Sequence, residues 1–308
     1  VALQAALDHV QKFKIPVHMT FIESDGDRVK HLDGVLARYR QQVAASQNVE
    51  LNERVRQGKC ETQLNEIIDK LEEAGQGTWP CLCFLDQFGY SRVPMQLLGR
   101  ILSHRWWEVF ALIEWNRLNQ TITDKDKWPA IARAFGGERW KPALNLSGSE
   151  RQAFLVNTYR QAMKDAGAKY TWHFSMRDAN NKLIYWLFFG SGGIDGLYNM
   201  KKAMKRPDPS GTYSFSDFHE GQGQRSLFAY SQDMLAEDLA HEFSGQTLRV
   251  SEVRHHVLTR TPGVNYTAAR TSQEETARLF VDSPPPDRRR GSFVKYQADD
   301  PPLNVRFV

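Results

Sequence analysis

The 308-residue sequence is long enough for one large domain with an appendix, or for two domains. An apolar share of 41% and a charged share of 25% are ordinary for a globular protein, and a formal net charge of +4 is too small to identify a nucleic-acid partner by itself. No apolar run approaches the roughly 20 residues of a membrane span, and the first residues lack the basic region and cleavage site of a signal peptide, so we expect a cytoplasmic protein with no membrane partner.

Strands and helices alternate through the first part of the chain. Apolar residues at positions 3, 6, 7, 10 and 13 predict a helix over 1–14, which Pro16 ends. The other expected helices contain residues 29–39, 64–71 and 94–104, and the expected strands cover 17–23, 49–56, 81–85 and 108–113. This alternation predicts an α/β fold with a doubly wound, mostly parallel sheet.

The run from Cys81 to Leu85 is continuously apolar and then changes abruptly to Asp86-Gln87-Phe88-Gly89. Such a run predicts a strand that is buried on both faces. In an open α/β sheet, functional residues collect just past the carboxyl ends of the strands. We therefore expect Asp86 at a cleft with Phe88 beside it; the alternative is that Asp86 caps the next helix and Phe88 packs in the core.

The pattern changes after Glu114. Residues 115–148 carry tryptophans amid polar and glycine-rich segments and predict a helical insertion. A helix over 147–166 follows, and then come two strand-like runs, 169–176 and 182–189, joined by turn-forming residues. The sheet is thus expected to end in an antiparallel hairpin, followed by a helix over 194–205.

A small separate module is predicted at the carboxyl end. Gly221–Gly223 is the best linker candidate, which divides a domain over 1–220 from a module over 231–308. In the module we expect helices at 232–243, near 250–258 and at 271–281, then a basic turn and two strands, 292–296 and 303–307. Helices followed by a basic hairpin form the outline of a winged helix.

The sequence has three cysteines, Cys60, Cys81 and Cys83, an odd number without the C-x-x-C spacing of a zinc site. Cys81 and Cys83 alternate with Leu82 in the predicted buried strand. We expect them to act as small apolar residues and expect no metal site.

Several local strings, in the same order along nearly the whole chain, resemble the three-Cys-motif partner proteins, a family similar to class I S-adenosylmethionine (SAM) methyltransferases with a winged-helix-like tail. Class I methyltransferase sheets also end in an antiparallel hairpin. The three cysteines of the family name belong to a radical-SAM-like partner protein, which the resemblance implies as a partner here. The matching strings are Phe21–Glu23, Phe84–Tyr90, Val93–Met95, Ala166–Tyr170, Met176–Asp178, Leu187–Gly190, Gly196–Met204, Phe215–Asp217 and Arg289–Phe293.

The resemblance implies SAM as cofactor. Glu23, at the end of a predicted strand, matches the acid that accepts both ribose hydroxyls, and Ser24 beside it either contacts the cofactor or caps the next helix. Gly58, Cys60 and Glu61 fall where the adenine-contacting loop belongs. Family members also carry a first strand and a glycine-rich loop of the form D-x-F-A-G-x-G ahead of the opening helix; the given sequence does not include that segment, so either it starts late or the protein has lost the loop.

Asp86, Gln87 and Phe88 are similar to the catalytic motif of amino-methyltransferases. There an acid and a backbone carbonyl accept hydrogens from an exocyclic amine while an aromatic ring stacks on the base. The family motif has proline where this sequence has Gln87. The resemblance implies methyl transfer to an amino group of a nucleic-acid base, with Asp86 as acceptor and Phe88 as stacking face.

Basic residues in the second half suggest contacts with DNA or RNA. Lys201, Lys202, Lys205 and Arg206 form a basic helix end that could meet phosphate or complement the helix dipole. The candidates for phosphate contacts in the terminal module are Arg254, His255, Arg288, Arg289, Arg290 and Lys295. The alternative to an enzyme is a non-catalytic protein that keeps the methyltransferase fold to bind nucleic acid or to scaffold its partner; an oxidoreductase on a dinucleotide fold is a weaker third hypothesis.

Overall fold

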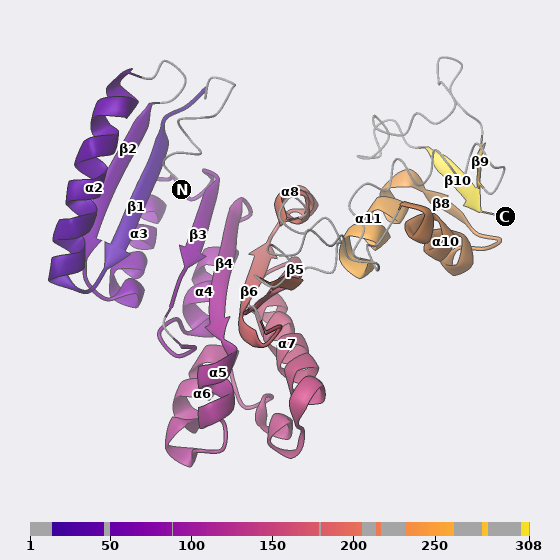
Figure 1. Cartoon of the computed structure of the whole chain (residues 1–308). Helices are drawn as coiled ribbons and strands as arrows, with labels where there is room; N and C mark the ends of the chain where they lie inside the picture. Colours follow the sequence, from indigo (N-terminus) through magenta and orange to yellow (C-terminus); the bar gives the residue numbers. More distant parts are fainter. Residues whose placement is uncertain are drawn as a thin grey trace. The chain divides into compact units, whose positions relative to one another are not determined.

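The structure is a computed structural model that describes residues 14–45, 50–87, 89–178, 180–204, 214–216, 232–261, 279–282 and 303–307. The chain divides into two compact units, residues 1–77 and 78–308, and both contain helices packed on strands, as expected for an α/β protein (Figure 1). None of the helices in the described ranges combines the length and the apolar character that a membrane crossing requires.

The first unit contains a parallel two-stranded sheet. Strand β1 (Val17–Glu23) has the predicted bounds, and β2 (Leu51–Gln57) begins two residues later than predicted. The strands pair in register from Val17 opposite Leu51 to Glu23 opposite Gln57. Their helices are α2 (Gly26–Ala45) and α3 (Cys60–Glu73). The carboxyl ends of both strands therefore lie at one edge.

The second unit contains a five-stranded sheet in the order β3-β4-β6-β5-β7. Strand β6 is antiparallel to both of its neighbours, and the other pairs are parallel. This confirms the predicted hairpin at the end of the sheet, whereas the short strand β7 was not predicted. The bounds of the strands are β3 Cys81–Leu85, β4 Trp107–Glu114, β5 Tyr170–Arg177, β6 Leu183–Ser191 and β7 Ser214–Ser216.

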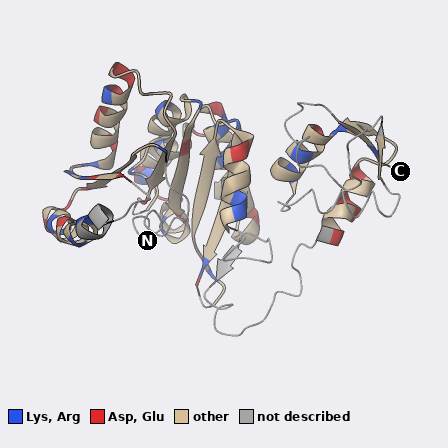
Figure 2. Ribbon diagram, turned by 90° about the horizontal axis from the view of Figure 1, so that it is seen from above, with Lys and Arg blue, Asp and Glu red and all other residues tan. Residues whose placement is uncertain are grey.

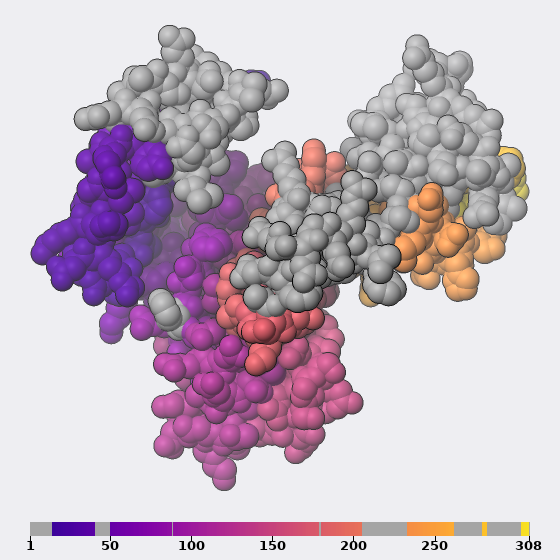
Figure 3. Space-filling view, in the orientation of Figure 1, coloured from indigo at the N-terminus to yellow at the C-terminus, as the bar shows by residue number. Residues whose placement is uncertain are grey.

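Helices cover the two faces of this sheet unequally. A Cβ atom on Gly190 of β6 would point at Met163 of α7 and Leu102 of α4, so these two helices cover that face of the sheet. On the other face, Phe110 and Phe189 share a core cluster with Leu197 of α8. The chain from β4 to α7, in magenta and pink, packs as one continuous body (Figure 3). The bounds of the helices are α4 Met95–Leu102, α7 Gly148–Asp165 and α8 Ile194–Met204.

The prediction that β3 is buried on both faces was wrong. Cys83 and Leu85 are buried, but Leu82 and Phe84 on the other face are each 57% exposed. Phe84 touches Phe110 of β4, on the side of the sheet that α8 covers. Helix α8 packs on β6 and β5, so the part of this face formed by β3 stays open to solvent in the described structure.

The stretch predicted as a helical insertion contains four short helices between β4 and α7. Aromatic side chains hold it together: Trp115 packs edge-on against Trp186 of β6, and Trp128 packs against the fully buried Trp140. Gly136 ends one helix at a φ of 69°. The helices are α5 Trp115–Thr121, η1 Lys125–Lys127, α6 Trp128–Phe135 and η2 Lys141–Asn145.

The carboxyl-terminal part of the second unit combines two helices with an antiparallel sheet in the order β8-β10-β9. The predicted helix over 271–281 was wrong at its end, because Leu279–Asp282 pairs with β10 as a strand. The predicted linker at 221–223 and strand at 292–296 lie outside the described residues. The elements are α10 Gln232–Glu242, β8 Thr247–Arg249, α11 Val250–Arg260, β9 Leu279–Asp282 and β10 Asn304–Phe307.

Two adjacent glycines after β6 allow a direct test of the packing. A Cβ atom on Gly192 would lie 2.7 Å from the backbone oxygen of Arg105, whereas a Cβ atom on Gly193 would meet nothing within 4 Å. Backbone cannot move aside as a side-chain end can, so we expect Gly192→Ala to lower the free energy of unfolding by about 1–3 kcal/mol. Gly193→Ala is the matched control and should be nearly neutral in the same urea titration. Equal losses in both variants would contradict this packing.

Candidate functional site

Residues predicted to bind the cofactor gather at the carboxyl edge of the β1–β2 sheet. Glu23 ends β1, and the backbone N–H of Gly58, just after β2, donates to the Glu23 carbonyl oxygen at 2.9 Å. Cys60 and Glu61 begin α3 two residues later. The structure therefore brings Glu23, Ser24, Gly58, Cys60 and Glu61 to one edge of the first unit.

The Glu23 carboxylate organises the turn that follows it. Its Oε1 accepts hydrogen bonds from the backbone N–H of Asp25 at 2.9 Å and from the Ser24 hydroxyl at 3.3 Å. The Asp25 N–H lowers the pKa of Glu23, with help from Ser24 and from Arg28, whose guanidinium lies 4.0 Å from Oε2. The side chain stays 28% exposed, and a carboxylate has about four lone-pair sites, so Glu23 can still accept hydroxyl donors.

The structure shows which of the two neighbouring residues, Ser24 or Asp25, caps helix α2. Asp25 Oδ1 accepts from the backbone N–H groups of Asp27 and Arg28, so Asp25 caps the start of α2. The hydroxyl of Ser24 instead donates to Glu23. Ser24 therefore supports the carboxylate and leaves the capping to Asp25.

Gly58 and Cys60 have clear local reasons for their residue types. Gly58 has a φ of 152°, and a Cβ atom there would lie 2.9 Å from Cγ of Gln63. Burial, followed by the charge of Glu61, raises the pKa of the Cys60 thiol, so this thiol stays protonated. Cys60 can therefore pack against a ligand but is a poor nucleophile.

The loop after β3 presents Asp86 and buries Gln87. Asp86 is exposed, whereas the side chain of Gln87 makes three hydrogen bonds. Its Nε2 donates to the Leu112 carbonyl of β4 at 3.1 Å, and its Oε1 accepts from the backbone N–H groups of Arg92 and Val93 at 3.0 and 2.9 Å. Gln87 thus fixes the loop, and its amide is committed within the protein instead of facing a substrate.

Further contacts anchor the same loop. Gly89 has a φ of 85°, which favours glycine, and its carbonyl accepts from the backbone N–H of Glu114 at 3.0 Å. The hydroxyl of the buried Tyr90 lies 2.8 Å from Oγ1 of Thr121. Phe88, the predicted stacking residue, lies outside the described residues. The residues on either side of Phe88 are therefore tied to β4 and α5.

The predicted nucleic-acid residues of α11 are engaged inside the second unit. The Arg254 guanidinium forms an ion pair with Asp195 of α8, and its side chain is only 11% exposed. The His255 ring packs edge-on against Tyr170 of β5, with 5.7 Å between centroids. The Arg254 side chain is therefore largely withdrawn from solvent, whereas His255 stays exposed beside Tyr170. The other four candidates, Arg288, Arg289, Arg290 and Lys295, lie outside the described residues.

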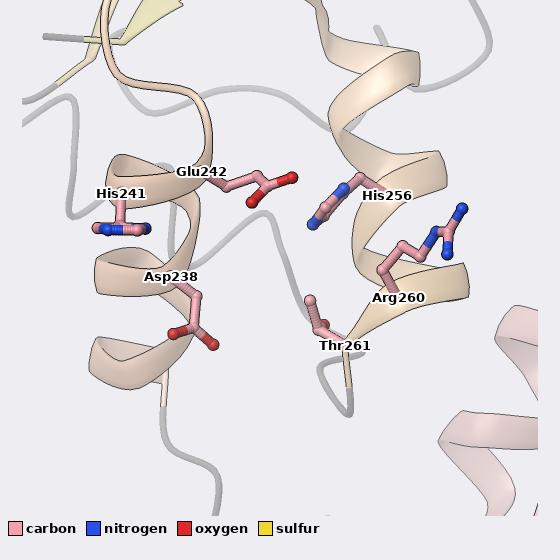
Figure 4. A pocket seen from close by; sticks show the side chains of 6 residues that line it. All are labelled: Asp238, His241, Glu242, His256, Arg260 and Thr261. Atoms are coloured by element: carbon pink, nitrogen blue, oxygen red, sulfur yellow. The ribbon is translucent and has the colours of Figure 1, made fainter.

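An open hollow of about 580 Å³ between α10 and α11 was not predicted. Glu242 and His256 point toward one another across it (Figure 4). Burial lowers the pKa of His256, with Arg260 and His255 acting in the same direction, whereas Glu242 and Asp238 oppose them. The helical spacing of Asp238, His241 and Glu242 was the only sequence signal for this hollow. No group of three or more His, Cys, Asp or Glu in the described ranges could hold a metal ion.

Charge is mixed along the described helices, where Lys and Arg alternate with Asp and Glu (Figure 2). No protein-family model, curated protein or solved structure gives a significant match to this chain. The functional argument therefore depends on the chain's own geometry and on the resemblance of its local motifs.

Proposed function

We propose that this chain is a SAM-dependent methyltransferase-like protein that acts on, or is guided to, nucleic acid and works with a radical-SAM-like three-Cys-motif partner. The observation that carries the proposal is the single reversed strand β6 between the parallel strands β4 and β5. Class I methyltransferases end their sheets in this way. The exposed acid directly after β3 adds to the argument, because chemistry in such sheets collects at the carboxyl ends of parallel strands.

In this proposal Glu23 accepts the ribose hydroxyls of SAM. Its lowered pKa keeps it ionised at neutral pH, and an anion at a strand end accepts two hydroxyl hydrogen bonds well. Gly58 keeps the neighbouring turn free of a side chain, and Cys60 with Glu61 lies beside it at the start of α3. The adenine would meet this turn.

Asp86 would accept a hydrogen from an amine of the target base. Methyl transfer needs an in-line approach, and most of its rate comes from positioning. The family motif obtains a rigid loop from proline, whereas here the three hydrogen bonds of Gln87 supply rigidity by another route. A fixed loop after Asp86 supports the proposal, because the acceptor must be held in place for methyl transfer.

The terminal module would bring the nucleic acid. Its order of helix, strand, helix, strand, strand and its sheet order β8-β10-β9 are compatible with a winged helix. In that arrangement the residues that join β9 to β10, which include Arg288, Arg289, Arg290 and Lys295, would form the wing. Phosphate contacts from a wing would make binding strongly salt-dependent.

A non-catalytic scaffold that binds nucleic acid or the radical-SAM-like partner is the second candidate function. The engagement of Arg254 and His255 in contacts within the chain favours a role in holding the module on the sheet. A scaffold would keep the fold and the salt-dependent binding without binding SAM. Cofactor binding therefore separates the two candidates.

We expect the full-length protein to bind S-adenosylhomocysteine with micromolar affinity by isothermal titration calorimetry. Glu23→Ala should weaken this binding at least tenfold because it removes the ribose acceptor, a loss of about 1.4 kcal/mol or more. Asp86→Ala is the matched control, since it removes an exposed acid at the other predicted strand end and should leave cofactor affinity nearly unchanged while abolishing methyl transfer. Equal affinity in wild type and Glu23→Ala, or no heat with folded wild type, would leave the scaffold as the better explanation.

A further inference from the structure

Arg160 of α7 contacts strand β5 with part of its guanidinium group. Its Nε donates to Oγ1 of Thr171 at 3.4 Å, and its Nη2 donates to the Thr171 carbonyl oxygen at 2.9 Å. The guanidinium carbon also lies 5.3 Å from the centroid of the Trp172 ring. These contacts occupy two of the three nitrogens, and Nη1 has no acceptor in the described ranges. The half-buried Arg160 therefore keeps donors for a ligand.

Arg260, the last residue of α11, brings a second cation close to Arg160. The Nζ of Lys201 lies 4.1 Å from the centroid of the Trp172 ring and donates to the Thr261 carbonyl oxygen at 2.7 Å. The backbone beside Arg260 is therefore fixed near Trp172. Burial, followed by the charge of Arg260, lowers the pKa of Arg160. Both guanidinium groups still carry their charge at neutral pH, so they repel each other.

The charges of the two arginines are not neutralised within the part of the chain that the structure describes. No carboxylate there forms an ion pair with Arg160 or Arg260. Asp238 and Glu242 line the hollow that Arg260 also borders. The Arg260 side chain, however, points away from α10, whereas Glu242 points toward His256 (Figure 4). An anion from outside the chain would therefore relieve the repulsion and accept the remaining hydrogen bonds.

The chemistry of the pair suits a phosphate group. A guanidinium presents its N–H donors in a planar fork that matches phosphate oxygens, and two such groups can bind different oxygens of one phosphate. We propose that Arg160 and Arg260 together bind one phosphate group of a nucleic-acid backbone. The need for an anion follows from the two unpaired charges, whereas the choice of nucleic acid rests on the proposed function. This contact would fix the orientation of the nucleic acid on the second unit without reading its sequence.

We would measure binding of fluorescein-labelled DNA and RNA of about 20 nucleotides, as single strands and as duplexes, by fluorescence anisotropy at several salt concentrations. Arg160→Gln and Arg260→Gln should each weaken binding about tenfold at low salt, because each removes charged hydrogen bonds to the phosphate. The double variant should lose less than the sum of the two single losses, since both arginines hold the same phosphate. It should also reduce the salt slope by about 1.

Arg139→Gln is the matched control. Arg139 belongs to the same unit, but its guanidinium already forms an ion pair with Asp165 at 2.6 Å. Removing this paired charge should leave nucleic-acid affinity close to that of wild type. Equal losses in Arg139→Gln and Arg260→Gln would mean that the net charge of the protein, and not a site at β5, determines binding.

A charge reversal tests the repulsion directly. Arg260→Glu supplies a carboxylate beside Arg160, so it should bind nucleic acid more weakly than Arg260→Gln and melt no lower than wild type. Arg139→Glu changes the net charge equally and should weaken binding less. A marked loss of thermal stability in Arg260→Glu would contradict the proximity of the two arginines.

Circular dichroism would establish that each variant is folded, and the exposed Arg260 carries the test if Arg160→Gln unfolds. Equal binding by wild type and folded Arg260→Gln, or no binding of any strand by wild type, would overturn the site. Titration with S-adenosylhomocysteine separates this result from the proposed function. Cofactor binding without nucleic-acid binding would remove only the phosphate site, whereas binding of nucleic acid through Arg260 without cofactor binding would keep the site and favour the scaffold.

Discussion

Replacing Gln87 with alanine should lower the free energy of unfolding by about 3 kcal/mol or more. The change removes one donor and one double acceptor from a side chain that is only 4% exposed. The Leu112 carbonyl and the backbone N–H groups of Arg92 and Val93 would lose their partner, and each buried unpaired group costs about 1–3 kcal/mol. Urea unfolding, monitored by tryptophan fluorescence, measures the loss.

Two further variants separate the hydrogen bonds from the loss of volume. Gln96→Ala on the exposed side of α4 is the matched control and should stay within about 0.5 kcal/mol of wild type. Gln87→Glu keeps an oxygen that can accept from the backbone N–H groups of Arg92 and Val93, but it can donate to Leu112 only when protonated. Burial would raise the folded-state pKa of that glutamic acid, so its stability should fall relative to wild type as pH rises above the unfolded value of about 4.3. A Gln87→Ala protein as stable as Gln96→Ala would contradict a stabilising role for the three hydrogen bonds of Gln87.

The loop that contains Asp86 and Gln87 shows which part of the site the sequence could predict. The change from an apolar run to Asp86 located the end of β3, because strand ends are a local property of the chain. The role of Gln87 depends on a carbonyl 25 positions later, which no local pattern contains. The commitment of the Gln87 amide to hydrogen bonds within the protein therefore became visible only in the structure.

The burial of side chains, like the role of Gln87, depends on residues that are distant in the sequence. Leu82 and Phe84 belong to an apolar run, yet each is 57% exposed because burial needs a covering element, and α8 packs on β6 and β5 instead. Strand β9 was mistaken for the end of a helix because its four residues become a strand only by pairing with β10, far along the chain. Strand β1 was predicted with the correct bounds because alternation and the terminal acid are both local.

Lys201 differs most from what its local sequence predicts. We expect its replacement by methionine to lower the stability of the second unit by an amount similar to that for Gln87→Ala. The sequence placed it in a basic helix end, but its side chain is fully buried. Its Nζ donates to the carbonyl oxygens of Leu258 at 3.1 Å and Thr261 at 2.7 Å, and it lies 4.1 Å from the centroid of the Trp172 ring. Lys201 thus joins α8 and β5 to the end of α11.

Methionine would fill most of the lysine volume but would leave both carbonyl oxygens without this donor. We expect Lys201→Met to lose about 3 kcal/mol, which corresponds to a melting temperature about 6–12 °C lower for a unit of this size. Lys202→Met, one residue later on the exposed side of α8, is the matched control and should melt within about 2 °C of wild type.

Hydrogen exchange would show where the loss occurs. Because Lys201 binds the end of α11, the amides of α11 should lose protection in Lys201→Met while those of β4 and β6 keep theirs. Uniform loss of protection across the second unit would instead mean that the lysine supports the whole unit. Identical melting of Lys201→Met and Lys202→Met would contradict the buried contact itself. If only α11 loses protection, the hydrogen bonds of Lys201 to the Leu258 and Thr261 carbonyls hold the end of α11 against α8 and β5.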